Sequence, residues 1–136
     1  MIRQLIIGSI VIAITVAIQA EMFNVLSNRI EPLIRSLRHW LRRFANTGVI
    51  VTAVLFVLLV QTVLVWLSAS DFILVGAFDT LEPALYFALV SFTTVGFGDI
   101  TLAPEWRLLS GLTTANGFLS FGWSSADMVE LVRRTA

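Results

Sequence analysis

The sequence predicts an all-α membrane protein with three transmembrane helices and one short helix that enters the membrane without crossing it. Composition is the first reason: 57% of the 136 residues are hydrophobic and 13% are charged, and the mean hydropathy is +0.90, far more apolar than a soluble domain needs. The second reason is that residues 4–20, 44–70 and 108–126 contain no charged side chain. The third is a further apolar segment, residues 81–92, too short to span a hydrocarbon core of roughly 30 Å.

Residues 1–27 are predicted to form the first transmembrane helix. Their charge-free core reaches the required length when residues 22–26 extend it. The region also has features of a cleaved secretory signal, since Arg3 precedes an apolar run that ends in the sequence IQA. Cleavage would leave the arginine-rich segment that follows outside the cell, against the positive-inside rule, so we favour an uncleaved helix.

Residues 28–45 interrupt the hydrophobic pattern with five arginines. These are Arg29, Arg35, Arg38, Arg42 and Arg43. Apolar residues between them recur every three or four positions, which predicts an amphipathic linker helix on the membrane surface, with its arginines on anionic lipids. Regularly spaced arginines are also typical of a voltage-sensing segment, but such a segment must cross the membrane, and the neighbouring spans leave no room for another crossing. We therefore favour the interfacial helix.

Two further transmembrane helices are predicted, an outer one at residues 46–70 and an inner one at residues 106–132, with the short helix 81–92 between them. Thr80 is suited to cap the short helix, and Glu82 suits the positive end of its dipole. The C-terminal carbonyl groups of this helix, which carry roughly half a negative charge, would face the centre of the membrane. There they can stabilise a cation that has lost its water.

The heptapeptide TTVGFGD follows the short helix at residues 93–99. Gly96 and Gly98 can adopt backbone conformations that other residues avoid, so the carbonyl groups of residues 94–97 can all point toward one axis. Together with the hydroxyl of Thr94, these oxygens would replace the water around an ion. A site made of oxygen ligands alone suits a hard monovalent cation and does not suit a transition metal.

The heptapeptide and its flanking helices resemble the potassium channel pore-domain family. The sequence ALYF at residues 84–87, the TVGFG loop and the sequence NGFLSFG at residues 116–122 are similar to the pore helix, selectivity filter and inner helix of that family, over residues 46–131. The chain looks like a bacterial two-transmembrane-type ion channel with an extra N-terminal transmembrane helix. The resemblance implies passive K⁺ conduction through a filter. The K⁺ ligands that it implies are Thr94, Val95, Gly96 and Phe97. The filter-supporting residues that it implies are Thr93, Gly98 and Asp99.

The inner helix contributes the candidate cavity and gate. Gly117 falls where the family has its hinge glycine. A glycine inside a helix costs about 1 kcal/mol relative to alanine, so its presence indicates either bending or close packing. The resemblance implies that Phe118, Phe121 and Ser125 face the cavity. Asn116 is the unusual polar residue of this span, and we expect it to hydrogen-bond to a neighbouring helix.

Three positions depart from the best-known pattern of the family. Phe97 replaces a tyrosine, Phe87 cannot donate a hydrogen bond as a tryptophan would, and Val90 stands where some relatives carry a glutamate. Asp99 therefore lacks that carboxylate partner. Because selectivity depends on carbonyl geometry, we expect these departures to affect the stability of the filter and its inactivation.

One filter loop cannot surround an ion. Because the chain supplies one, we expect a homotetramer with cyclic symmetry.

The sequence has no cysteine, a single histidine, His39, and no recognisable catalytic nucleophile or phosphate-binding loop. We therefore expect no enzyme activity, no cofactor apart from K⁺ as the permeant ion, and no nucleic-acid partner. Two alternatives stay open: a weakly selective cation channel, and a non-conducting membrane subunit that modulates other channels.

The arginines predict the orientation in the bilayer. With three spans, the arginines of residues 28–45 and of residues 133–134 fall on one side, and the other side receives Arg3 and Arg107 with most of the acidic residues. The positive-inside rule makes the basic side cytoplasmic. The N-terminus and the mouth of the filter are then outside and the C-terminus is cytoplasmic, in a multi-pass protein of the cell membrane. The resemblance implies a bacterial inner membrane.

Overall fold

The computed structural model describes residues 1–40 and 44–135, with side chains at all of these positions except 30, 31, 33, 34, 37–40, 45 and 135. This part of the chain forms four α-helices and no strand. They are α1 (Ile2–Trp40), α2 (Ala45–Leu74), α3 (Leu81–Phe92) and α4 (Arg107–Thr135). A short 3-10 helix, η1 (Pro104–Trp106), precedes α4. The predicted all-helical class is confirmed for the described residues.

Two helical segments are long and apolar enough to cross a membrane. They are Ile2–Arg29 within α1 and Asn46–Leu74 within α2. α4 has 29 residues against 30 in α2, but its many glycine, serine and threonine residues make it less apolar. The two segments support a membrane protein. A third crossing by α4 and a tetramer stay predictions.

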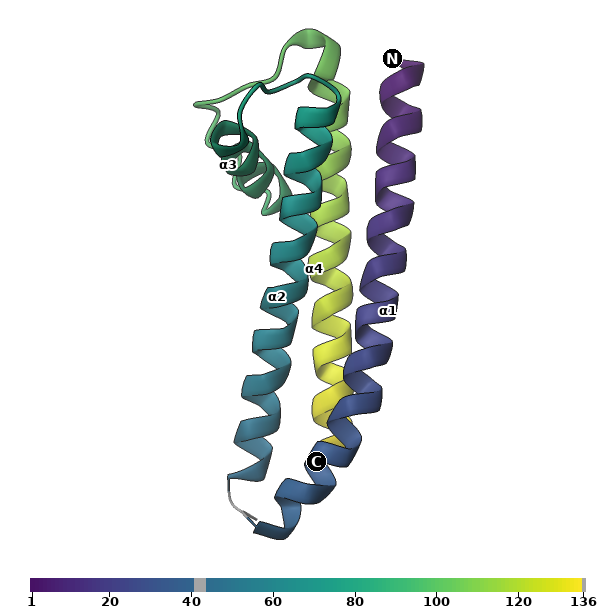
Figure 1. The fold of residues 1–136 in the computed structure, drawn as a ribbon, viewed down its shortest axis with the longest axis vertical. Coiled ribbons are helices and arrows are strands. Elements are labelled where there is room, and N and C mark those ends of the chain that lie inside the picture. Colours follow the sequence, from purple (N-terminus) through teal and green to yellow (C-terminus); the bar gives the residue numbers. More distant parts are fainter. Residues whose placement is uncertain (41–43, 136) are drawn as a thin grey trace.

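In the structure, the predicted N-terminal span and residues 28–40 of the predicted linker helix are parts of one continuous helix. α1 runs without interruption from Ile2 to Trp40 and contains Pro32. A proline inside a helix removes one backbone hydrogen bond and favours a bend, and the lower part of α1 turns out of line with its upper part in Figure 1. Arg29 and Arg35 are exposed. The side chains of Arg38, Arg42 and Arg43 lie outside the described residues.

The three long helices pack side by side, and α3 lies beside one end of them (Figure 1). α1 and α4 run in the same direction, and α2 runs in the opposite direction. The N-terminus lies at the end where α3 is found, and the C-terminus lies at the other end. α1 packs on both α4 and α2 of its own chain. The hydrophobic pattern of the sequence does not show which helices the extra N-terminal helix contacts.

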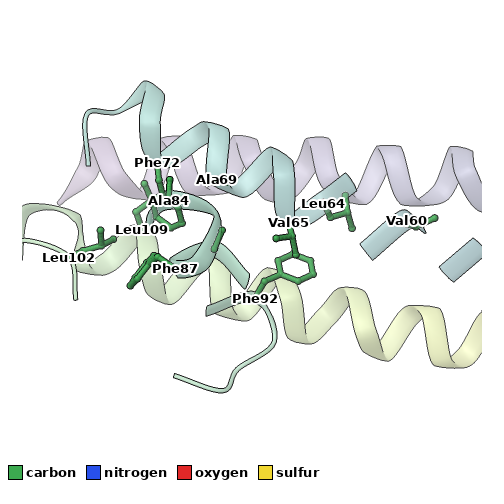
Figure 2. Close-up of a cluster of buried hydrophobic side chains, with 11 residues drawn as sticks. Val60, Leu64, Val65, Ala69, Phe72, Ala84, Phe87, Phe92, Leu102 and Leu109 are labelled. Atoms are coloured by element: carbon green, nitrogen blue, oxygen red, sulfur yellow. The ribbon is translucent and has the colours of Figure 1, made fainter. Parts of the chain in front are cut away.

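The main hydrophobic core joins α3 to α2 and α4 (Figure 2). The rings of Phe72 on α2 and Phe87 on α3 meet edge to face, with centroids 5.2 Å apart. Phe92, the last residue of α3, is completely buried. Burial of a phenylalanine side chain contributes roughly 1.5–3 kcal/mol, so these contacts hold α3 firmly and position the loop that follows it. A second cluster joins the three long helices toward the other end, through Leu26, Val49, Ala53 and Leu131.

Candidate functional site

The short helix α3 begins as the sequence suggests and carries the loop of residues 93–99 at its C-terminal end. Thr80 occupies the N-cap position with extended backbone, although its side chain makes no capping hydrogen bond. Glu82 lies in the first turn, where its negative charge interacts favourably with the positive end of the helix dipole. α3 ends at Phe92, and the loop leaves the helix at Thr93.

Backbone hydrogen bonds attach the start of the loop to the last turn of α3. The amide of Thr93 donates to the carbonyl oxygen of Leu89 at 3.0 Å, and the hydroxyl of Thr93 donates to the same oxygen at 2.7 Å. The amides of Val95 and Gly96 both donate to the carbonyl oxygen of Val90, at 3.0 and 3.2 Å. The first half of the heptapeptide is therefore a continuation of the helix end and not a free connection.

The φ angle of the loop backbone is positive at every second residue, a pattern that few sequences allow. The positive angles are 61° at Thr94, 55° at Gly96 and 77° at Gly98. The two glycines adopt such angles without steric cost. Among the described residues, Thr94 is the only one with a positive φ that is not a glycine. A positive φ is a true outlier for a residue with a β-branched side chain. Sequence reasoning missed it, because it assigned unusual backbone conformations to the glycines alone.

The outer part of the loop is held by a hydrogen bond that the sequence does not predict. The hydroxyl of Tyr86 on α3 donates to Oδ2 of Asp99 at 2.7 Å. This bond is the largest cause of a raised pKa of the Tyr86 hydroxyl, and desolvation and the negative charge of Asp99 contribute less. Sequence reasoning missed this bond, because the departures from the family pattern concern Phe87, Val90 and Phe97. Tyr86 is the one tyrosine of the chain.

The loop is open to its surroundings in the single chain. Val95 is 53% exposed and Phe97 is 71% exposed. If the carbonyl groups of these residues face an ion axis, the side chains of Val95 and Phe97 point away from it and can hold the loop only by packing against something else. The described part of this single chain leaves more than half of each side chain uncovered.

α4 passes directly against the end of α3 at Gly117. A Cβ atom built on Gly117 would overlap the carbonyl oxygen of Phe92, and it would lie 2.7 Å from the carbonyl carbon. Nothing lies within 4 Å of a Cβ built on Gly111 or Gly122. Gly117 is therefore a close-packing position between α4 and the helix that carries the loop. Bending at Gly117 stays a prediction.

The three other residues predicted to line a cavity share one face of α4. Phe118 is 70% exposed and Phe121 is 40% exposed, and Ser125 is exposed with its hydroxyl bonded to the carbonyl oxygen of Phe121 at 2.9 Å. Their spacing of three and four residues places them on the same side of the helix. The structure brings this face close to the end of α3, since the ring centroids of Phe121 and Phe92 lie 6.0 Å apart.

The opposite side of α4 is bonded to α1 through polar side chains. The hydroxyl of Thr15 lies 2.9 Å from Oδ1 of Asn116, which confirms that Asn116 bonds to a neighbouring helix. Near the start of α4, Oε1 of Gln4 accepts hydrogen bonds from the amides of Leu108 and Leu109, at 3.1 and 3.3 Å. Those amides have no partner inside their own helix. A side chain of α1 thus caps the N-terminus of α4.

Two glutamines from different helices hold the middle of α4. Nε2 of Gln19 on α1 donates to the carbonyl oxygen of Ser120 and to Oγ of Ser124, both at 3.0 Å. Nε2 of Gln61 on α2 donates to Oγ of Ser124 at 3.0 Å, and Oε1 of Gln61 accepts from the hydroxyl of Ser120 at 3.0 Å. All four side chains are buried. We name this group the glutamine clasp; sequence reasoning missed it, although glutamines inside apolar spans are a signal for such bonds.

Within the described residues, no group of three or more acidic or histidine side chains is placed to hold a metal ion. The oxygen atoms that residues 94–97 can offer to an ion are backbone carbonyl groups and the hydroxyl of Thr94. That donor set suits a hard cation.

Comparison with known proteins connects this arrangement with a family. Residues 52–134, which comprise most of α2, α3, the loop and nearly all of α4, match a family model described as "Ion channel". The match leaves out α1. No curated protein and no solved structure matches the chain.

Proposed function

Because this chain belongs to the ion channel family, which includes the pore domains of potassium channels, we propose that it conducts K⁺ passively across a cell membrane. Four copies form the pore, and the loop at residues 93–99 of each copy supplies the selectivity filter. Membership of the family supports permeant ions and oligomeric assembly, with no cofactor. The choice of K⁺ is inferred from the chemistry of the loop.

The observation that carries this proposal is the positive φ at Thr94, Gly96 and Gly98. An extended chain points successive carbonyl groups in opposite directions, whereas a change of backbone hand at every second residue brings them toward one side. The carbonyl oxygens of residues 94–97 then replace the water around K⁺. Holding a threonine at a positive φ costs about 1–3 kcal/mol, and such strain is typical of functional sites.

The place of α3 favours a cation at the inner end of the loop. The helix ends at the loop, so the partial negative charge of its C-terminus is directed to the region where an ion would lose its water. The hydrogen bonds from Val95 and Gly96 to Val90 keep the loop next to that helix end. Four such helix ends in a tetramer would add their effects.

The exposed surfaces of the single chain support assembly. Val95 and Phe97 lack cover in the subunit, and we propose that neighbouring copies supply it. In the same assembly the face formed by Phe118, Phe121 and Ser125 lines the inner cavity. Gly117 keeps α4 against the end of α3, so bending of α4 at this glycine would act on the support of the filter and gate it.

The remaining parts follow from this arrangement. Residues 46–136 form the pore domain, residues 1–27 form an additional span with its N-terminus outside, and residues 28–45 lie on the cytoplasmic membrane surface. Arg29 and Arg35, which are exposed, would contact anionic lipid headgroups there.

The deciding experiment is ion flux into proteoliposomes that contain the purified full chain, with K⁺ and Na⁺ gradients tested separately. In Gly96→Ala, the φ of 55° becomes strained, at about 1–3 kcal/mol for each subunit, and we expect K⁺ flux to fall by about tenfold or more. Gly76→Ala is the matched control. Its φ of 77° is also positive and its surroundings are equally open, but it lies outside the loop, so its flux should equal that of the wild type.

Each result has a defined meaning. K⁺ flux that Ba²⁺ blocks and Gly96→Ala loses would support the proposal. Equal K⁺ and Na⁺ flux would instead indicate the weakly selective cation channel. An intact tetramer without flux in any ion would contradict conduction and favour the non-conducting subunit.

A further inference from the structure

A small cavity lies between the three long helices, apart from the loop of residues 93–99. It offers about 10 Å³ to the centre of a water-sized sphere, which is about the room that one water molecule needs. Its polar lining residues are Asp71 on α2 and Thr113 and Asn116 on α4, and its other lining residues, from α1 and α4, are apolar. The lining thus combines one carboxylate, one hydroxyl and one amide with an apolar surface.

Asn116 brings an unpartnered hydrogen-bond donor to this cavity. Its side chain is 2% exposed, and Nδ2 of its amide has no hydrogen-bond partner among the described residues. Oδ1 of the same amide is bonded to the hydroxyl of Thr15 at 2.9 Å, and Thr15 is not part of the cavity lining. Because the two atoms of an amide group point apart, Nδ2 is the atom left for the cavity. A buried donor without an acceptor is unfavourable, so a group that accepts from it would stabilise the structure.

Asp71 brings an acceptor to the same cavity, but no direct bond joins it to Asn116. Asp71 is the one residue of α2 in the lining, and its side chain is partly buried. Among the described residues, no hydrogen bond or ion pair is made by its carboxylate. An acidic group within a membrane is costly unless it has a partner. The cavity therefore separates a donor that lacks an acceptor from a carboxylate that lacks a donor.

The polar groups of the lining disfavour an ion of either sign. A cation would face the amide protons of Asn116, and an anion would face the carboxylate of Asp71. A neutral water molecule can accept from Nδ2 with its oxygen and donate a proton to the carboxylate, and it can also bond to the hydroxyl of Thr113. Buried water molecules typically make about three hydrogen bonds to groups of this kind.

We propose that this cavity binds one water molecule, which bridges Nδ2 of Asn116 on α4 and the carboxylate of Asp71 on α2, with the hydroxyl of Thr113 as a third partner. A bridging water is nearly as favourable in enthalpy as a direct hydrogen bond. The described hydrogen bonds between α2 and α4 otherwise come from Gln61. The water adds a second polar connection between these helices, one position before Gly117, where α4 contacts the end of α3.

The test detects the water itself, so it stands whether or not the chain conducts K⁺. The full chain with ¹⁵N-labelled asparagine is placed in lipid bilayers, and magnetisation transfer from water to the side-chain amides is followed by solid-state NMR. Asn116 is the buried one of the four asparagines, since Asn24, Asn28 and Asn46 are exposed. The signal that Asn116→Ser removes belongs to Asn116. We expect this buried amide to receive magnetisation from water in the wild type.

Two variants of the lining and a matched control make the result specific. Asp71→Leu removes the acceptor and should reduce the transfer to Asn116 by about half or more. Thr113→Val keeps the shape of the side chain but lacks the hydroxyl, and it should reduce the transfer by a smaller amount. Asp79→Leu is the control, because Asp79 is exposed outside the helices, and its transfer should equal that of the wild type.

Thermal unfolding in nanodiscs gives an independent measurement of the bridge. If one water joins the two side chains, the effects of Asp71→Leu and Asn116→Leu on the unfolding temperature should not add. We expect the double variant to differ from the sum by about 2 °C or more. Asn116→Leu combined with Asp79→Leu should be additive, because no bridge reaches Asp79.

Other outcomes would overturn the proposal. They are no transfer from water to Asn116 in the wild type, equal transfer in the wild type and Asp71→Leu, and additive effects of Asp71→Leu and Asn116→Leu. Non-additive effects without a water signal would show a direct bond between the two side chains in place of the water. If Asp71→Leu does not fold, Thr113→Val decides, and transfer equal to that of the wild type would contradict the site.

Discussion

At the scale of single residues, the structure separates glycines that look alike in the sequence. Gly111, Gly117 and Gly122 all lie in α4, and each could serve close packing or bending. A side chain on Gly117 would meet the backbone of Phe92, whereas one on Gly111 or Gly122 would meet nothing within 4 Å. Backbone cannot move aside as a flexible side chain can, so the contact at Gly117 is the one that tolerates no substitution.

This contrast predicts opposite effects of the same substitution in one helix. Gly117→Ala should destabilise the folded protein by about 1–3 kcal/mol, because overpacking forces α3 and α4 apart. Gly122→Ala should be neutral or stabilise by up to about 1 kcal/mol through the higher helix propensity of alanine. Thermal unfolding in nanodiscs measures both. Equal stability of the two variants would show that the close approach of α4 to Phe92 is absent.

At the scale of helices, polar bonds determine how α1 is attached. The hydropathy of α1 indicates an apolar span. The hydropathy pattern does not show whether such a helix faces lipid or bonds to a neighbouring helix. In the structure, Gln4 of α1 caps the start of α4, and Thr15 of α1 bonds to Asn116. Gln19 of α1 is part of the glutamine clasp. In a membrane, where apolar surface alone does not drive helices together, such bonds and close packing select the partner.

The glutamine clasp predicts a coupled loss of stability. Gln19→Leu and Gln61→Leu should each cost about 1 kcal/mol, in the range of interhelical hydrogen bonds in membranes. The double variant should lose an amount that differs from the sum, because both glutamines bond Ser124. Thr62→Val is the control, since the exposed hydroxyl of Thr62 bonds only the carbonyl of Leu58 in its own helix. Strict additivity in a double-mutant cycle would argue against a shared clasp.

At the scale of the whole molecule, α4 is packed against α1 and α2 on one face and is exposed on the opposite face. Polar bonds and apolar packing join α4 to α1 and α2, whereas Phe118 and the loop residue Phe97 are 70% and 71% exposed. Apolar side chains are also exposed on α1 and α2, as at Ile10 (54%) and Leu55 (61%), where lipid would cover them in a membrane. In the proposed channel, Phe118 would instead line the cavity and Phe97 would pack against a neighbouring copy.

The absence of cysteine from the sequence allows a direct test of that lining. A membrane-impermeant, water-soluble thiol reagent applied from the side that α4 ends on should block K⁺ flux through Phe118→Cys. Leu119→Cys is the control, because Leu119 is also exposed, at 57%, but lies about 100° around the helix from Phe118 and would face lipid. Its flux should be unchanged. Block of both variants, or of neither, would contradict a pore along the Phe118 face.

Much of this architecture can be predicted from the sequence, because it depends on local properties of the chain. The apolar segments and their lengths indicate helices, and the 12-residue helix α3 covers the residues expected of it. The glycines of residues 93–99 indicate a loop with unusual backbone, and two of its three positive φ angles fall on them. Composition and the spacing of glycines suffice for these features, since neither depends on which helix lies next to which.

Contacts between distant parts of the chain could not be predicted in this way. Thr15 and Asn116 are 101 positions apart, and their meeting depends on the rotation and register of two helices whose apolar patterns allow several arrangements. The same holds for the contact of Gly117 with Phe92, the bond from Tyr86 to Asp99, the glutamine clasp and the unbroken course of α1 through Pro32. A hydrophobic pattern determines which residues avoid water, whereas only packing in three dimensions decides which neighbours they meet.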